Sequence, residues 1–193
     1  NLMGYDFTMY PSNYFQWAHY FELEDQVLNV LCNAAEDADV ILDIGANIGL
    51  YSLAMAKHTK GRVYAFEPNP KTSRLAQNHI ERNNVENVEL HKIGLSDEVT
   101  TATLHNATDD LGKASLRAQS SSKNDVEVEI STIDVFLKKQ KIKSVDLIKI
   151  DVEGLEMAVI RGGWKTIESQ LPHILFEATP DWMNENDFET FER

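Results

Sequence analysis

The chain has 193 residues, 42% apolar and 25% charged, the balance of one soluble globular domain large enough for a core of its own. Its 31 acidic against 18 basic residues give a net charge of −13, which disfavours a nucleic acid as partner. No apolar run reaches the length of a membrane span, and the single cysteine, Cys32, excludes an intrachain disulfide. We therefore expect a protein of a reducing compartment, the cytoplasm.

The N-terminal stretch, residues 1–21, is rich in aromatic side chains and shows little periodicity. We interpret it as an aromatic flap that packs on one main domain of residues 22–193. The chain stops at Arg193 within a polar stretch that resembles the opening of a helix. We therefore expect the domain to be truncated at its C-terminus.

Strand and helix patterns alternate along the main domain. The predicted strands are 40–44, 62–67, 88–95, 145–151 and 173–178, and the predicted helices are 22–36, 47–58, 70–83, 133–139 and 153–167. Two alternating segments, 99–105 and 126–131, are expected to form an antiparallel pair beside the main sheet, joined by a polar, mobile loop. Such alternation predicts an α/β fold with a doubly wound, mostly parallel sheet.

The most informative segment is "VILDIGANIGLYSLA", residues 40–54. A buried strand ends there in a turn with Gly45 and Gly49, and a helix follows at once. The free N–H groups and the positive dipole end of that helix favour a polar ligand. Gly45 is expected to let the backbone approach that ligand, and Gly49 to let helix and strand pack closely.

A second signal is Glu67, which ends the next predicted strand 67 − 49 = 18 residues after Gly49. That spacing suits the acidic residue that binds the ribose hydroxyls of a nucleoside cofactor. Together the two features predict a cofactor containing adenosine. The alternative is a generic tight turn followed by a solvated glutamate.

The turn reads D-x-G-x-x-x-G, and Tyr51 or Ser52 takes the place of the third glycine of a dinucleotide-binding turn. This favours a cofactor with a small polar tail, S-adenosylmethionine, over NAD. An NAD-dependent oxidoreductase and an inactive cofactor-binding fragment remain the alternatives.

Three segments, "VILDIGANIGLYSLAMAK", "VYAFEPNP" and "VDLIKIDVEGLEMAVIRGG", resemble in that order the FkbM-type S-adenosylmethionine-dependent methyltransferases. The resemblance covers about Val40 to Thr179. It implies a class I methyltransferase fold and methyl transfer to a hydroxyl of a sugar or secondary metabolite.

The resemblance also assigns residues by position. It implies that Asp43, Gly45, Ala46, Asn47 and Gly49 shape the methionine end of the site. It also implies that Glu67 binds the ribose hydroxyls, with Pro68 and Asn69 flanking, and that Gly94, Leu95, Ser96 and Asp97 edge the adenine. Asp151 and Glu153 should lie where cofactor meets substrate. The antiparallel hairpin that normally closes such a sheet has no counterpart here, so we expect an exposed edge beside 173–178 that can pair with another chain.

Methylation of a hydroxyl needs a group that accepts its proton. Asp151, at the end of the fourth predicted strand, is the first candidate, although it could instead cap the next helix or anchor the cofactor's ammonium group. Glu153 is expected at the start of that helix, and Glu177 is a weaker candidate. Lys149 lies two residues before Asp151 on the same strand face, where it would pair with that carboxylate or orient the substrate.

The histidines form no ligand pattern. His58 and His79 are expected on exposed helix ends or faces, whereas His105 borders the polar loop and either contacts substrate or is an ordinary surface residue. Asp151, Glu177 and an asparagine could hold Mg²⁺, but no spacing requires a metal, and none is predicted.

Overall fold

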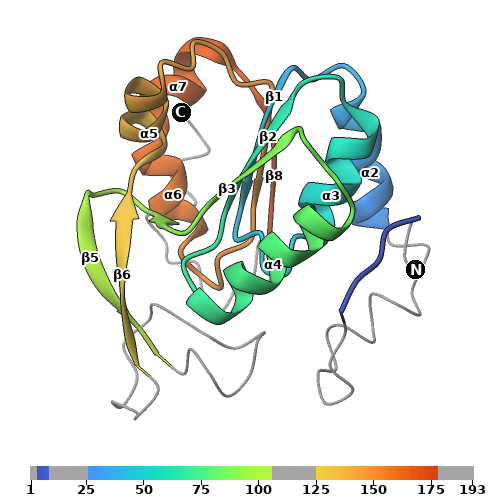
Figure 1. The fold of residues 1–193 in the computed structure, drawn as a ribbon. Helices are drawn as coiled ribbons and strands as arrows, with labels where there is room; N and C mark the ends of the chain where they lie inside the picture. The colour runs from blue at the N-terminus through green and yellow to red at the C-terminus, as the bar shows by residue number, and fades with distance from the viewer. Residues whose placement is uncertain (1–3, 9–25, 106–124, 178–193) are drawn as a thin grey trace.

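A computed structural model of the chain describes residues 4–8, 26–105 and 125–177. Most of the predicted aromatic flap, the loop between the antiparallel strands and the chain from residue 178 onward therefore lie outside the described residues. The architecture is a central sheet with helices on both faces, beside which lies a small second sheet (Figure 1).

The central sheet has five parallel strands in the order β3-β2-β1-β7-β8. Their bounds are β1 (Val40–Ile44), β2 (Arg62–Phe66), β3 (Val88–His91), β7 (Leu147–Ile150) and β8 (His173–Phe176). The predicted doubly wound parallel sheet is confirmed. Because the chain proceeds outward from β1 in both directions, the strand order reverses between β1 and β7, where ligands of such sheets bind.

Six helices cover the two faces of this sheet within the described residues (Figure 1). One face carries α2 (Gln26–Ala35), α3 (Leu50–His58) and α4 (Pro70–Arg82), and the other α5 (Ile133–Gln140), α6 (Glu156–Gly162) and α7 (Trp164–Gln170). Both faces of the strands are consequently buried, which explains their nearly continuous apolar sequences. None of the described helices has the length and apolar character needed to cross a membrane.

The small sheet has the order β4-β6-β5, with β4 (Gly94–Leu95), β5 (Thr100–Leu104) and β6 (Val126–Ser131). The pairing of β5 with β6 is antiparallel, as predicted. The single predicted strand 88–95 is wrong, because it divides into β3 in the main sheet and β4, which pairs in parallel with β6. Leu95 of β4 is 2% exposed and packs in the hydrophobic cluster that contains Phe66 of the central sheet.

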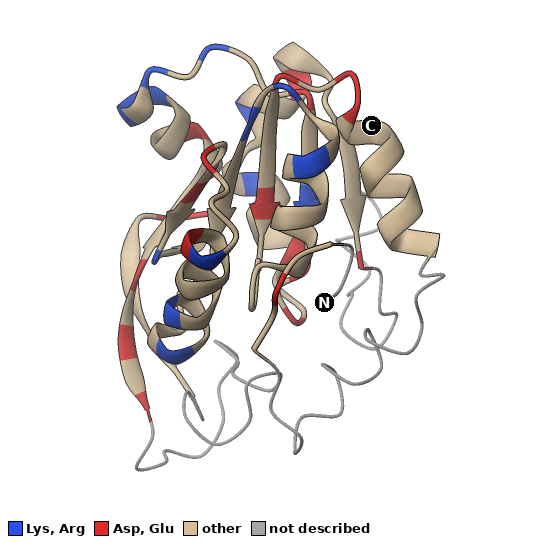
Figure 2. Ribbon diagram, turned by 45° about the vertical axis from the view of Figure 1, so that its right-hand side comes forward, with Lys and Arg blue, Asp and Glu red and all other residues tan. Residues whose placement is uncertain are grey.

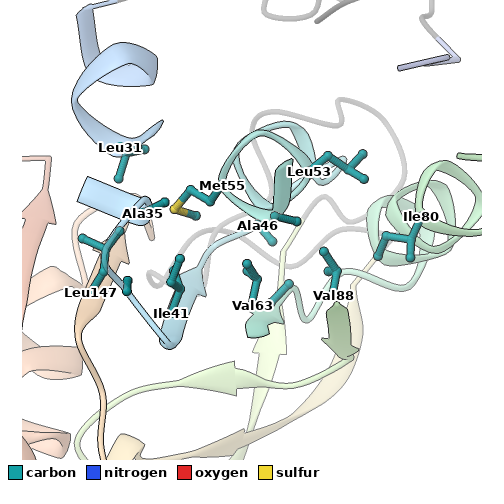
Figure 3. Packing of buried hydrophobic residues seen from close by; sticks show 13 residues of the cluster. Leu31, Ala35, Ile41, Ala46, Leu53, Met55, Val63, Ile80, Val88 and Leu147 are labelled. Atoms are coloured by element: carbon teal, nitrogen blue, oxygen red, sulfur yellow. The ribbon is translucent and has the colours of Figure 1, made fainter. Parts of the chain in front are cut away.

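The core on the α2–α3 side joins helices and strands that are distant in the chain (Figure 3). Leu31 and Ala35 of α2 and Met55 of α3 lie over Ile41 of β1 and Leu147 of β7. A second cluster on the opposite face contains aromatic side chains of β2 and α5, Phe66 and Phe136, whose rings meet edge to face with centroids 4.7 Å apart. These two clusters hold β1 and β7 side by side at the centre of the sheet.

Two helices begin later than predicted. The first begins at Leu50 rather than residue 47, because Asn47 and Gly49 have left-handed backbone, with φ of 51° and 85°. The helix expected from Glu153 begins at Glu156, because φ is 55° at Glu153 and 91° at Gly154. Both corrections lie in the loops that follow β1 and β7, where backbone outliers are typical of functional sites.

Candidate cofactor and catalytic site

Charged residues of both signs are spread over helices, strands and loops of the described chain (Figure 2). Among the described Asp, Glu, Lys and Arg residues, four are buried: Asp43, Glu67, Lys149 and Glu156. Asp43 lies in β1 and Lys149 in β7, Glu67 directly follows β2, and Glu156 begins α6, the helix that follows β7. Since burying a charge is costly unless it is paired, this cluster marks the edge of the sheet where we look for a site.

The glycine turn lies at the centre of that edge. Its first residues are fixed to β2, because the N–H groups of Gly45 and Ala46 donate to the Phe66 carbonyl at 3.0 and 2.9 Å. A Cβ on Gly45 would lie 1.8 Å from the Asp151 carbonyl oxygen. We expected Gly45 to let the backbone come close to a ligand. In this structure, Gly45 instead lets the backbone come close to the loop after β7.

Gly49 has a role different from the predicted one. Its φ of 85° requires glycine, and a Cβ there would meet Ala76 of α4 at an ordinary 3.5 Å, rather than a strand. Gly49 is therefore needed to end the turn and start α3. The tight packing of helix on strand that the sequence suggested does not depend on it.

Glu67 follows β2 directly and is 8% exposed, so the alternative of a solvated glutamate is wrong. Its Oε2 accepts the N–H of Asn47 at 2.9 Å, and its Oε1 accepts the N–H of Asn69 at 2.8 Å. Burial raises the pKa of Glu67 to about 7, although these two hydrogen bonds and the charge of Lys149 oppose the shift. Each oxygen retains a lone pair that can accept a further hydrogen bond.

The residues beside Glu67 orient the next helix. Asn69 is 2% exposed, and its Oδ1 accepts the N–H of Lys71 at 3.0 Å, which caps α4 as predicted, with Pro70 in the first turn. Pro68 between them is half-buried. The Glu67 carboxylate is thus held by two backbone N–H groups, that of Asn47 in the glycine turn and that of Asn69 at the cap of α4.

Lys149 is 2% exposed and joins the strands at the centre of the site. Its Nζ lies 3.3 Å from Asp43 Oδ1 and 3.3 Å from Asp151 Oδ2, and it donates to the Gly45 carbonyl at 3.1 Å. The ring of Tyr51 lies on a further side, with its centroid 5.0 Å from Nζ. The predicted pair with Asp151 is confirmed.

The partner that sequence reasoning missed is Asp43, which is fully buried. Its Oδ2 accepts the Ser52 hydroxyl at 2.5 Å, and Asp43 and Lys149 are register partners across β1 and β7. Although burial alone would lower it, the Asp43 and Asp151 carboxylates raise the pKa of Lys149 above its ordinary value. The lysine is therefore a cation that is held between two carboxylates.

The loop after β7 carries two carboxylates of different character. The Asp151 side chain is 41% exposed, whereas Glu153 is half-buried in a left-handed conformation. Burial, and then the neighbouring carboxylates of Asp151, Glu177 and Glu156, raise the pKa of Glu153. Strained backbone and a raised carboxyl pKa are both typical of functional positions.

Glu156 shapes this loop. Its Oε1 accepts the N–H groups of Val152 at 3.1 Å and Gly154 at 3.0 Å. The cap of α6 is Leu155, so the alternative in which Asp151 caps that helix is wrong. Because Glu156 satisfies the loop's N–H groups, the carboxylates of Asp151 and Glu153 are not used for that purpose.

The segment predicted to edge the adenine lies on the small sheet. Leu95 is buried in the core beside Phe66, and the Ser96 hydroxyl donates to Asp97 at 3.2 Å. Asp97 also pairs with Arg161 of α6 at 3.3 Å. The assignment to adenine stays a prediction.

The structure contradicts the prediction for His79 and one of the two alternatives for His105. His79 is not on an exposed face but has no exposed surface at all, whereas the His58 side chain is 40% exposed as expected. His105 is 14% exposed and its Nδ1 lies 3.0 Å from Asp125, so it is no ordinary surface histidine. Within residues 4–8, 26–105 and 125–177, no three His, Cys, Asp or Glu side chains converge as metal ligands would.

Comparison with known proteins places this arrangement among methyltransferases. The family model for the methyltransferase FkbM domain matches residues 43–192. Methyltransferase 1 of Beauveria bassiana is 32% identical over 146 residues, which cover 65% of this chain and 59% of that protein. Hexuronic acid methyltransferase AglP of Haloferax volcanii is 30% identical over 151 residues, which cover 76% and 59%.

Among solved structures, the crystal structure of methyltransferase FkbM from Methylobacillus flagellatus KT superposes with a TM-score of 0.58 at 20% identity. The match covers 80% of this chain and 36% of that one, and it shows a shared fold. The chain spans about three fifths of the length of the two curated relatives.

Proposed function

The chain belongs to the FkbM methyltransferase family, and from this premise we propose that it binds S-adenosylmethionine and methylates a hydroxyl of a sugar or related metabolite. One observation carries the cofactor assignment: a buried carboxylate, Glu67, lies at the end of β2 against the glycine turn. Its remaining lone pairs suit the two hydroxyls of a ribose, each of which donates one hydrogen bond.

The residues present fit the other parts of such a cofactor. The exposed carboxylate of Asp151 suits a cationic amino group, and the Lys149 ammonium between Asp43 and Asp151 keeps that carboxylate in place. The N–H groups at the start of α3 suit a carboxylate. Bound there, S-adenosylmethionine would supply an electrophilic methyl group.

For the proton acceptor we favour Glu153 over Asp151. Asp151 already shares the Lys149 ammonium, and its charge stabilises that buried cation. Glu153 has a raised pKa and occupies a left-handed backbone position in the loop after β7. A base whose pKa is closer to neutrality accepts a hydroxyl proton more effectively at physiological pH.

The acceptor class rests on relatives. AglP is named as a hexuronic acid methyltransferase and matches 76% of this chain, which favours a sugar hydroxyl. A screen of monosaccharides, uronic acids and their glycosides, with mass detection of an added methyl group, tests this class. Methylation of none of them, by a protein that binds the cofactor, would contradict it.

The cofactor assignment is tested by isothermal titration with S-adenosylhomocysteine. We expect micromolar binding that weakens at least about tenfold in Glu67→Ala, a loss of about 1.4 kcal/mol. Glu81→Ala, on the exposed side of α4 where Glu81 contacts Gln77, is the matched control and should bind like the wild type. A folded wild type that does not bind the ligand would refute the proposal.

A further inference from the structure

His79 of α4 is buried completely, yet both its ring nitrogens have hydrogen-bond partners. Nε2 accepts the backbone N–H of Thr8 at 2.9 Å, and Nδ1 lies 2.8 Å from the carbonyl oxygen of Ile48. The two partners come from opposite sides: the N-terminal segment 4–8 and the glycine turn. A single side chain therefore connects these two parts of the molecule.

The hydrogen bonds fix the chemical form of the ring. A backbone N–H can only donate, so Nε2 must be without hydrogen, and the neutral ring carries its hydrogen on Nδ1. That hydrogen is donated to the Ile48 carbonyl. Burial lowers the pKa of His79, which agrees with a neutral ring.

The Ile48 carbonyl is part of the proposed cofactor site. It lies between two residues with left-handed backbone, Asn47 and Gly49. The N–H of Asn47 donates to Glu67 Oε2 at 2.9 Å, and the N–H of Gly49 closes the turn on Ala46 at 2.8 Å. Rotation of the peptide groups here would change the direction of the Asn47 N–H, so a bond to the Ile48 carbonyl helps to fix the contact with Glu67.

The other side of His79 is equally ordered. The Phe7 ring meets it edge-on with centroids 4.8 Å apart, and Arg82 donates to the Thr8 hydroxyl at 3.1 Å. Two hydrogen bonds join Asp6 and Asn83. The Asp6 N–H donates to Asn83 Oδ1 at 2.8 Å, and Asn83 Nδ2 donates to the Asp6 carbonyl at 3.0 Å. The imidazole is thus held in one orientation from the N-terminal side.

We propose that His79 is a positioning residue of the cofactor site, which holds the Ile48 carbonyl so that the turn presents the Asn47 N–H to Glu67. The N-terminal segment orients the imidazole for this task. The effect on ligand affinity rests on the proposed cofactor function, whereas the effect on the turn does not.

Two substitutions separate the two bonds. In His79→Asn, the side-chain amide nitrogen takes the place of Nδ1 and can still donate to Ile48, whereas the acceptor for Thr8 is lost. In His79→Gln, the terminal amide oxygen takes the place of Nε2 and can still accept from Thr8, whereas the donor to Ile48 is lost. His58→Gln, at a half-exposed histidine on α3, is the matched control.

Each variant is examined by hydrogen–deuterium exchange over residues 45–50 without ligand, by thermal unfolding, and by titration with S-adenosylhomocysteine. We expect His79→Gln to exchange faster in the turn and to bind at least about tenfold more weakly, and His79→Asn to resemble the wild type in both. The melting temperatures of the two variants should fall by similar amounts, because both lose one bond and some packing.

Equal exchange and equal affinity in the two variants would overturn the proposal, as would a loss of affinity that follows the melting temperature. If the wild type does not bind the ligand but the turn exchanges faster only in His79→Gln, the cofactor assignment fails and the positioning of the turn stands. If Glu67→Ala weakens binding but the two His79 variants do not differ, the cofactor assignment stands and the positioning role of His79 fails.

Discussion

Gly45 and Asp151 approach so closely that a Cβ on the glycine would lie 1.8 Å from the aspartate's carbonyl oxygen. Gly45 follows β1 and Asp151 follows β7, so this contact joins the two loops that carry the proposed cofactor and catalytic residues. The N–H of Asp151 donates to the Ile44 carbonyl at 3.0 Å, which fixes the same approach from the other strand. A change in either loop must therefore move the other.

Gly45→Ala should be far more destabilising than Gly49→Ala. Both glycines have positive φ, of 80° and 85°, which costs alanine about 1–2 kcal/mol. Only at position 45 does the new Cβ also collide with backbone. Urea unfolding should show a loss of about 1–2 kcal/mol for Gly49→Ala and at least about twice that for Gly45→Ala. Equal losses would mean that the loop after β7 moves aside easily.

Lys149→Met should destabilise the protein strongly, by about 3–5 kcal/mol, because the Asp43 carboxylate would be left buried without a counterion. Asp151→Asn, which removes the more exposed partner of the same ammonium, should cost less than about 1 kcal/mol. Urea unfolding of the two variants at pH 7.5 gives the comparison. If Lys149→Met were as stable as Asp151→Asn, the buried pair would not stabilise the sheet.

The affinity for S-adenosylhomocysteine should rise with pH. The pKa of Glu67 is about 7 in the free protein, and only the ionised carboxylate accepts hydrogen bonds from both ribose hydroxyls. The carboxyl is mostly protonated at pH 6 and mostly ionised at pH 8, so Kd should fall by up to about tenfold between them. Isothermal titration at several pH values measures the slope.

In Glu67→Gln the same titration should give weaker binding and a flat pH dependence, since the amide does not ionise in this range. A slope that persists in the variant would assign the titration to another group.

Glu156→Ala should loosen the loop that carries Asp151 and Glu153. It removes the acceptor of the Val152 and Gly154 N–H groups, which should cost about 1–3 kcal/mol. Glu156→Gln keeps an oxygen at that place and should cost less than about 1 kcal/mol. Unfolding and amide exchange of residues 152–154 distinguish the two. Loop exchange that is unchanged in Glu156→Ala would contradict the assigned role.

The sequence predicted those features that depend on local pattern. The apolar run before Gly45 located β1, the pair Asn69 and Pro70 located the start of α4, and period-two spacing placed Lys149 and Asp151 on one face. The acidic residue after β2 was recognised by its distance from the glycine turn. Each of these signals lies within one element or between two neighbouring ones.

What the sequence could not predict depends on contacts between distant segments. His79 lies four residues after Leu75 and three after Ala76, on the buried face of α4, but its hydrogen-bond partners, 31 and 71 residues away, could not be read from that spacing. The partner of Asp43 could have been deduced only from the register of β1 on β7. Glu153 has a left-handed backbone because Glu156 binds the adjoining N–H groups, and residue type alone would have favoured a helix there.

The register of β1 on β7 gives the ion pair a further significance. Asp43 faces Lys149 across the two strands, and the neighbours of Lys149 on its own strand are Ile148 and Ile150. A slip by one residue would bring a buried carboxylate opposite an isoleucine and turn the lysine to the other face of the sheet. Misregistered sheets are thereby penalised by an unpaired buried charge, so a chain that has folded with the correct alignment has assembled the centre of its site in the same step.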